Sequence, residues 1–254
     1  MEAVYDEIGH RYVVTRQPDP RIAQAIRMAL GEVRTVLNVG AGSGSYEPHD
    51  REVTAVEPSA VMIAQRPPGA APAVQAHAEA LPFPDSSFDA AMAILSDHHW
   101  DDRAVGLREL RRVARRQVVL LTWDPRFADA FWLTRYYMPA SKRLVPGMVI
   151  EDIARCLGGA RSVPVPVPWD CRDGFYHAFW RRPAAYLNKR VRAGISVFAV
   201  LDNDQNTEIV NRLRADLQAG IWEQRNAELL DLAKIDLGYR LIVVEPESSS
   251  ATRE

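Results

Sequence analysis

The sequence predicts an α/β fold in which a mostly parallel β-sheet carries helices on both faces. Apolar segments with strand character alternate along the first half of the chain with segments of helical periodicity, a pattern typical of parallel sheets. The run 118–121 is apolar at every position, as expected for a strand that is buried on both faces. With 254 residues, the chain is long enough for one large domain of this kind.

Each element of the expected sheet has its own sequence signals. The segments with strand character are 34–39, 53–57, 73–76, 88–94, 117–123 and 239–244. The helices expected between and around them are 20–30, 60–66, 103–114 and 150–157. The first of these helices begins at Pro18-Asp19-Pro20 and ends at Gly31, since proline favours a helix start and glycine a helix end.

Prolines and short connections restrict the secondary structure that the remaining segments can form. Only residues 45–51, which include Pro48, separate the end of a glycine turn from the second strand. A crossover normally needs a dozen or more residues, so we expect a loop or a single turn there. Valine alternates with proline in segment 163–168, and each proline removes a ladder donor, which indicates an edge strand or an extended segment. Residues 183–232 are expected to be mostly helical.

Composition and charge disfavour several classes of function. Lys and Arg number 31 against 33 Asp and Glu, a net charge of -2, so neither nucleic acid nor a membrane is expected as a partner. The sequence has no apolar run near the ~20 residues of a membrane span and no signal peptide pattern. Cys156 and Cys171 lack the spacing of a metal site, so we expect no metal and a cytoplasmic protein with free thiols.

A motif for a nucleoside cofactor follows the first strand. The turn contains Gly40, Gly42 and Gly44, and the second strand ends at Glu57. Glycines let the main chain approach a ligand, and an acid at this position can accept hydrogen bonds from ribose hydroxyls. A dinucleotide site would have its third glycine where Ser45 stands, and a phosphate loop would have a lysine after its last glycine. The pattern therefore disfavours NAD.

A second motif, at 76–90, reads AHAEALPFPDSSFDA and precedes the fourth strand. Together with the glycine turn, Glu57 and the segment 107–113, it resembles the class I S-adenosylmethionine-dependent methyltransferases. Within that class, the chain is most similar to the small-molecule branch related to the ubiquinone and menaquinone methyltransferases. The resemblance extends from about Tyr5 to Trp123, and the segment 239–244 matches the closing strand.

This resemblance implies a Rossmann-like sheet of seven strands, mostly parallel with an antiparallel last strand, and flanked by helices. Roughly seventy residues between the last two strands imply a helical insertion. The expected division is a cofactor-binding core with an N-terminal cap helix at 1–124, followed by an aromatic-rich and helical acceptor or lid region at 125–238. A closing strand at 239–246 and a flexible tail at 247–254 complete it.

The resemblance also implies S-adenosyl-L-methionine as the cofactor. The glycine turn would lie around its methionine and ribose, Glu57 would bind the ribose, and Leu95 would belong to the wall near the sulfonium. Arg16 could bind the cofactor's carboxylate, or else pair with Asp19 or remain in solvent. The cofactor-binding residues implied in this way are Tyr5, Tyr12, Arg16, Gly40, Ala41, Gly42, Gly44, Glu57, Pro58, Ala78, Glu79, Leu95 and Ser96.

Two positions depart from the family pattern. Asn38 stands where the family usually has an acid, and His77 stands where it often has Asp near the adenine. Asparagine can still accept a hydrogen bond, but it brings no charge to attract the cationic end of the cofactor.

Candidate catalytic residues follow the fourth strand, where ligands gather in an open α/β sheet. His98 or His99 could take a proton from a hydroxyl acceptor, because histidine titrates near neutrality, or could simply line the site. His177 is a further candidate of the same kind. Asp124, after the fifth strand, could orient the acceptor or cap the following helix.

We therefore predict an S-adenosylmethionine-dependent methyltransferase that acts on a small organic acceptor, with O-methylation favoured. The first alternative is an NAD- or nucleotide-sugar-dependent enzyme on a similar fold, against which Ser45 argues. The second is a non-catalytic, methyltransferase-like binding module, which Asn38 and His77 keep open. The identity of the acceptor and the oligomeric state do not follow from the sequence.

Overall fold

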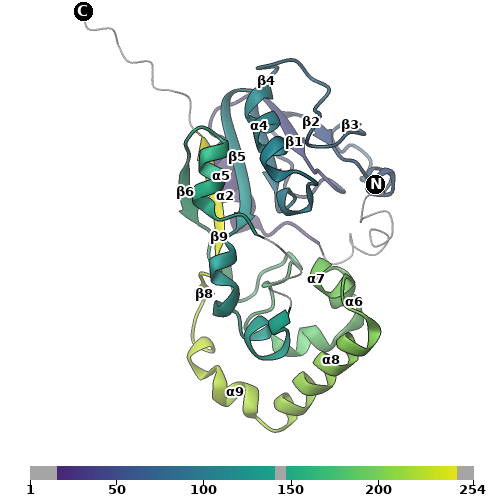
Figure 1. Ribbon diagram of the computed structural model, residues 1–254, viewed down its shortest axis with the longest axis vertical. Helices are drawn as coiled ribbons and strands as arrows, with labels where there is room; N and C mark the ends of the chain where they lie inside the picture. The colour runs from purple at the N-terminus through teal and green to yellow at the C-terminus, as the bar shows by residue number, and fades with distance from the viewer. Residues whose placement is uncertain (1–15, 141–146, 245–254) are drawn as a thin grey trace, which may run out of the picture.

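The computed structural model describes residues 16–140 and 147–244, and its main sheet has seven strands (Figure 1). The strand order is β3-β2-β1-β4-β5-β9-β6. The strands are β1 (Thr35–Val39), β2 (Glu52–Val56), β3 (Ala73–Val74), β4 (Phe88–Ile94), β5 (Ala114–Trp123), β6 (Arg161–Pro164) and β9 (Tyr239–Val244). Strands β1 to β5 pair in parallel, whereas β9 is antiparallel to β5 and β6. The fold class predicted from the sequence is confirmed.

Helices cover both faces of this sheet. The amphipathic helix α2 (Pro20–Leu30) buries Ile22, Ile26 and Leu30 in the core on one face. On the other face, α4 (Arg103–Val113) and α5 (Ile150–Cys156) belong to a second core and lie side by side in Figure 1. Alternate residues of β5 enter the two cores, because successive side chains of a strand point to opposite faces.

Several element ends differ from the expected ones, most of them by one or two residues. Strand β5 begins at Ala114, directly after α4, because Ala114 already pairs with Phe88 across an irregular register. Helix α3 (Ala60–Ala64) ends before Arg66, since a residue that precedes proline is disfavoured in the helical conformation. As predicted, the connection between β1 and β2 contains turns and no helix.

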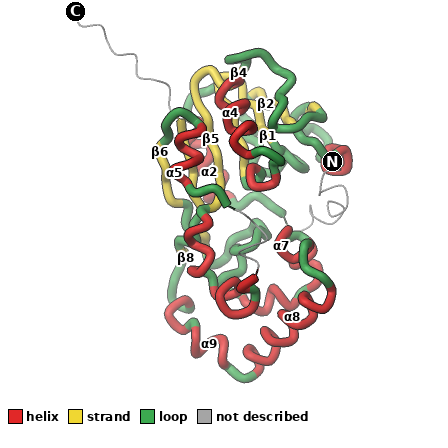
Figure 2. Tube along the Cα trace, in the orientation of Figure 1, coloured by secondary structure: helices red, strands yellow, loops and turns green. Residues whose placement is uncertain are grey.

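The segment between β6 and β9 forms a helical region, residues 165–238. Figure 2 shows α7, α8 and α9 of this region grouped below the sheet. The elements are β7 (Val167–Pro168), η6 (Pro183–Leu187), α6 (Lys189–Ala193), α7 (Ser196–Ala199), α8 (Asn203–Gln218), α9 (Ile221–Arg225), η7 (Ala227–Leu229) and β8 (Lys234–Ile235). Strands β7 and β8 pair as a separate two-stranded sheet. The predicted helical insertion is therefore confirmed. Of segment 163–168, predicted to be an edge strand or an extended segment, residues 163–164 belong to the edge strand β6 and residues 167–168 to β7.

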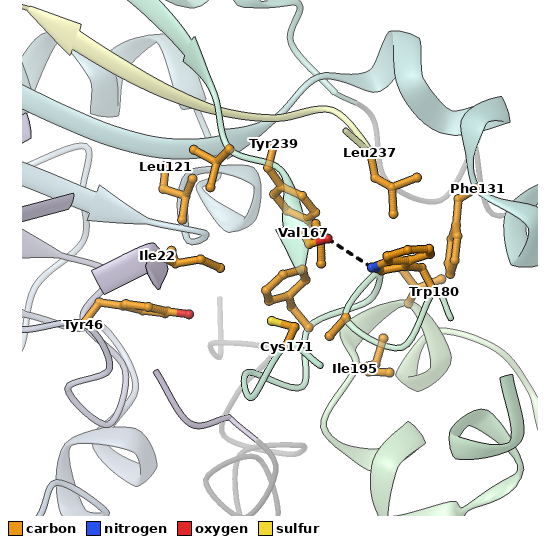
Figure 3. Close-up of a cluster of buried hydrophobic side chains, with 14 of the residues drawn as sticks. Ile22, Tyr46, Leu121, Phe131, Val167, Cys171, Trp180, Ile195, Leu237 and Tyr239 are labelled. Carbon is orange, nitrogen blue, oxygen red and sulfur yellow. Dashed lines mark hydrogen bonds between the residues drawn. The ribbon is translucent and has the colours of Figure 1, made fainter. Parts of the chain in front are cut away.

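The helical region shares one core with the sheet. Figure 3 shows Ile22 and Leu121, from α2 and β5, in the same buried cluster as Trp180 and Ile195. The Trp180 Nε1 donates a hydrogen bond to the carbonyl of Val167 at 3.1 Å, so this indole is satisfied although it is fully buried. Because the two parts pack through large apolar side chains, the sheet fixes the position of the helical region.

Some predictions fall on other parts of the chain. Tyr5, Tyr12, the cap helix and the tail lie outside the described residues, and the division into domains stays a prediction.

None of the helices in the described ranges is both long and apolar enough to cross a membrane. Cys156 and Cys171 are free thiols.

Candidate active site

The carboxyl ends of β1 to β4 surround a cavity that we call the glycine-loop cavity. Its wall contains the turn after β1, Glu57 and Pro58 after β2, residues 77–79 after β3, and Leu95 and Ser96 after β4. Ligands of open α/β sheets bind at this edge because the strand ends converge there. The structure therefore brings together the segments that the sequence motifs indicated.

The turn after β1 needs a glycine at its first position. Gly40 has a φ of +68°, and an added Cβ would lie 2.5 Å from the Cβ of Ser96. The Ser96 hydroxyl donates to the carbonyl of Val39 at 2.9 Å, which keeps the ends of β1 and β4 in contact. The backbone N–H groups of Gly40 and Ala41 both donate to the carbonyl of Val56. This close packing leaves the cavity side of the turn open to a ligand.

Glu57 holds the same turn from the neighbouring strand. One carboxylate oxygen accepts a hydrogen bond from the N–H of Gly42 at 2.8 Å, and the other accepts from the N–H of Ser59 at 3.0 Å. The side chain is buried, yet it forms part of the cavity wall. Because an ionised carboxylate has about four acceptor sites, Glu57 can orient the turn and also accept from a ligand hydroxyl.

A buried ion pair supports the turn from behind. Arg66 and Glu47 lie 2.8 Å apart, with side chains only 6% and 7% exposed. Arg66 also donates to the carbonyl of Gly42, and the Asn38 amide donates to Glu47. An added Cβ at Gly44 would meet Glu47 at 3.2 Å. Glu47 of the short crossover thus lies beside Asn38, but its charge is paired with Arg66 and it is not among the wall residues of the cavity.

A second cavity, of about 410 Å³, lies next to the first. We call it the aromatic cavity, because Trp123, Phe175, Tyr176, His177 and Tyr239 all line it. They come from the ends of β5 and β9 and from the helical region. Phe175, Tyr176 and His177 belong to the aromatic-rich region expected at 125–238, and the binding of the acceptor in this cavity stays a prediction.

Three residues, Arg16, Leu95 and His99, line both cavities. Leu95 follows β4 with a φ of +53°, and its N–H donates to the carbonyl of Leu121. The left-handed conformation costs a non-glycine residue about 1–2 kcal/mol, so the neighbouring strand must hold it in place. Strain of this kind concentrates at functional sites, and here it lies at the boundary between the two cavities.

His98 and His99 belong to the short helix η2 (Asp97–His99), and their ring centroids are 4.0 Å apart. Burial lowers the pKa of His98 to about 4, and the guanidinium groups of Arg103 and Arg16 add to this effect. Desolvation by the surrounding protein also lowers the pKa of His99, with a contribution from His98. Both imidazoles are therefore neutral at pH 7, although His99 is exposed at the cavity wall. A catalytic role for either histidine stays a prediction.

Arg16 is fixed by the helical region. Its Nε donates to Asp173 at 2.6 Å, and the hydroxyl of Tyr46 donates to the other oxygen of the same carboxylate at 2.9 Å. Asp19, the partner considered from the sequence, pairs with Arg21 instead. Asp173 is 1% exposed, so it positions Arg16 at the boundary of the two cavities without lining them.

The remaining candidates separate into two roles. Asp124 is buried, accepts from the N–H of Arg126 at 3.0 Å and caps the short helix η3 (Pro125–Ala130), as the second interpretation predicted. His177 lines the aromatic cavity and is hydrogen bonded through Nδ1 to the Tyr239 hydroxyl at 2.8 Å. Burial lowers the pKa of His177 to about 3, so this imidazole is also neutral at pH 7.

Trp100 and Arg103 are among the cavity residues that sequence reasoning did not select. Trp100 lines the glycine-loop cavity and packs on Gly106, where an added Cβ would lie 2.4 Å from its ring. The glycine within a predicted helix was a signal of this close approach. Arg103 lines the aromatic cavity, and nothing in the sequence singled it out. Gly44, by contrast, does not belong to the wall of either cavity.

Comparison with known proteins identifies the family. Residues 37–122 match the family of the methyltransferase domain. A protein from Anabaena variabilis, described as a methyltransferase from an antibiotic biosynthesis pathway, is 34% identical, with 91% of this chain and 98% of that chain covered and a TM-score of 0.85. The chain belongs to the S-adenosylmethionine-dependent methyltransferases.

More distant relatives of this methyltransferase share its fold. A methyltransferase from Thermotoga maritima is 22% identical, covering 66% of this chain and 86% of that one, with a TM-score of 0.52. Geranyl diphosphate C-methyltransferase from Streptomyces coelicolor, solved with S-adenosylhomocysteine, is 14% identical, covering 89% and 77%, with a TM-score of 0.50. The uncharacterized protein YafE of Escherichia coli is 40% identical over 50 residues, a match to 20% of this chain and 24% of YafE.

The methyltransferase family membership confirms three predictions. The chain is a class I methyltransferase, it is an enzyme, and its cofactor is S-adenosylmethionine. The alternatives of an NAD-dependent enzyme and a non-catalytic module are therefore not supported. The relationship to the ubiquinone and menaquinone branch and the cytoplasmic location stay predictions.

Proposed function

We propose that this methyltransferase transfers a methyl group to an oxygen of a small organic acceptor that binds in the aromatic cavity. The observation that carries the proposal is the common wall of the two cavities, formed by Arg16, Leu95 and His99. Methyl transfer is an in-line displacement, so donor and acceptor must meet across one boundary. A volume of about 410 Å³ and an aromatic lining are typical of small-molecule sites.

In this proposal the glycine-loop cavity holds the cofactor. Gly40, Ala41 and Gly42 lie against its methionine and ribose, Glu57 accepts from the ribose hydroxyls, and Ala78 lies near the adenine. The open turn and the carboxylate beside it fit a nucleoside with an extended side chain. The cofactor supplies a methyl group that its sulfonium charge already activates. The protein therefore has to align the acceptor and exclude water.

The other implied residues extend the same assignment. Pro58, Glu79 and Ser96 line the glycine-loop cavity and would contact the cofactor there. Arg16 lines both cavities, where its guanidinium could bind the carboxylate of the cofactor. Gly44 would act indirectly, because its place is beside Glu47 behind the turn.

His99 is the residue that we propose to handle the acceptor proton. It lines both cavities, and as a neutral imidazole it can accept the hydrogen bond of an acceptor hydroxyl. When the oxygen forms its bond to the methyl carbon, the hydroxyl proton passes to this imidazole. His98 lines the aromatic cavity alone and would contact the acceptor there.

Replacing His99 with asparagine is expected to slow turnover by about a hundredfold. General bases usually contribute roughly 10²–10⁴, and the low pKa of this histidine places its effect at the lower end. Single-turnover rates with methyl-labelled cofactor measure the change, while the affinity for S-adenosylhomocysteine should be preserved. Full turnover of His99→Asn from pH 6 to pH 9 would exclude proton transfer to His99.

Replacing Glu57 with alanine is expected to weaken cofactor binding by about 1–3 kcal/mol, the range for the loss of a charge-assisted hydrogen bond. The variant loses both the contact to the ribose and the bond that orients Gly42. Calorimetry with S-adenosylhomocysteine measures the change. Glu52→Ala is a suitable control, because Glu52 is exposed at the start of the same strand. An unchanged affinity of Glu57→Ala would show that the ribose is held elsewhere.

The methylated atom and the acceptor class require a separate test. Incubation with methyl-labelled cofactor and metabolite extracts, followed by mass spectrometry, identifies the product and the atom that carries the label. A methyl ether or ester supports the proposal, and a methylated nitrogen or carbon contradicts it. The antibiotic biosynthesis assignment of the Anabaena variabilis relative supports the choice of small molecules as candidate acceptors.

A further inference from the structure

Arg103 forms a rigid cationic wall in the aromatic cavity. It is the first residue of α4, and its Nη2 donates to the hydroxyl of Thr122 at 2.8 Å and to the carboxylate of Asp97. Thr122 in turn donates to Asp97 at 3.0 Å. Asp97 is completely buried and the Arg103 side chain is only 11% exposed. The guanidinium is therefore held in one position from β5 and η2.

At Arg103 this arrangement presents a cationic hydrogen-bond donor to the cavity. Arg103 lines the cavity, whereas Asp97 lies behind it and is not part of the wall. Within the described residues, both hydrogen bonds that Arg103 donates come from Nη2, which leaves Nη1 for a ligand. The positive charge of Arg103 also acts on the neighbouring wall of the cavity, because it contributes to the lowered pKa of His98. Asp129, the one acid among the described wall residues, is exposed.

The aromatic walls offer flat apolar surfaces. The Trp123 indole N–H donates to the carbonyl of Leu237 at 2.8 Å, and the hydroxyls of Tyr176 and Thr134 are 2.9 Å apart. Nδ1 of His177 is bonded to the hydroxyl of Tyr239. Apart from Nε2 of His177, these polar ends are bonded within the protein. Trp123 and His177 stack on each other with their centroids 5.6 Å apart, and the parts of the rings that line the cavity give a planar ligand an apolar surface.

We propose that the acceptor is a planar aromatic or conjugated molecule that carries a carboxylate, and that Nη1 of Arg103 binds this carboxylate. The inference rests on the proposed function, because it assigns the ligand of the same cavity. Both N–H groups of Nη2 are donated to Asp97 and Thr122, so a carboxylate oxygen can accept one charge-assisted hydrogen bond from Nη1 of a guanidinium that is already oriented. A phosphate, with three oxygens to satisfy, would call for more donors than this corner supplies.

The test compares matched probes on protein that is saturated with S-adenosylhomocysteine. 2-Naphthoate is expected to bind at least tenfold more tightly than 2-naphthamide, and also more tightly than 2-naphthyl phosphate, as measured by calorimetry. Since Arg103→Gln alone would leave Asp97 buried without its partner, the double variant Asp97→Asn/Arg103→Gln removes both charges together. It should reduce the preference for naphthoate to less than threefold.

Arg126→Gln is the matched control, because Arg126 lines the same cavity but is 54% exposed at its edge. This variant should retain the preference for naphthoate. The inference is overturned if wild-type protein binds naphthoate no better than naphthamide, including the case in which it binds neither. It is equally overturned if naphthyl phosphate binds best or if the double variant keeps the preference. Failure to bind S-adenosylhomocysteine, by contrast, would contradict the proposed function itself.

Discussion

Replacing Arg66 with methionine is expected to lower the free energy of unfolding by about 3–5 kcal/mol, the usual cost of leaving one buried charge without its partner. Arg66 and Glu47 are both more than nine-tenths buried, and Arg66 binds both oxygens of the Glu47 carboxylate at 2.8 Å. In the variant, Glu47 would retain the Asn38 amide as a donor but no cation. Urea unfolding monitored by circular dichroism measures the change.

Two further variants make this prediction specific. Arg34→Met removes an ion pair of the same type whose partners, Arg34 and Glu52, are 80% and 61% exposed, so its cost should stay below about 1 kcal/mol. The double variant Glu47→Gln/Arg66→Met should recover more than half of the lost stability, because no uncompensated charge remains. If Arg66→Met costs no more than Arg34→Met, the pair does not support the glycine turn as the structure indicates.

The sheet and the position of the site could be predicted because local sequence encodes them. The apolar run 118–121 indicates a strand that is buried on both faces. The spacing from Gly40 to Glu57 indicates two adjacent parallel strands. The absence of a crossover helix between β1 and β2 could also be predicted, because segment 45–51 is too short to form one. In each case the physical cause acts over a few residues, so that a single segment carries the information.

The contacts that complete the site act between distant segments. Arg16 pairs with Asp173, 157 residues away, and Glu47 reaches Asn38 and Arg66 only because the crossover folds back. The low pKa of His98 likewise depends on burial and on Arg103, neither of which its own sequence neighbourhood reveals. The distance between two charged side chains and the dielectric environment of a buried group are properties of the folded chain. A sequence motif shows only which residues are available for such contacts.

The stability of the protein is expected to fall by about 3 kcal/mol between pH 8 and pH 4 through His177 alone. Burial lowers the pKa of His177 in the folded state to about 3, whereas an unfolded histidine titrates near 6.5. As the pH falls below 6.5, the unfolded chain takes up a proton that the folded chain still excludes. Stability contributed by this group is therefore present above pH 6.5 and is lost as the pH falls toward the folded pKa.

Two histidine variants isolate this contribution. His177→Asn is expected to lose about 3 kcal/mol less than the wild type over the same pH range in urea unfolding, since it has no imidazole to protonate. His49→Asn, at an exposed position in the short crossover, should follow the wild-type pH dependence. Parallel curves for wild type and His177→Asn would mean that water reaches the imidazole in the folded protein. The aromatic cavity would then be too polar at this wall to stack a planar acceptor.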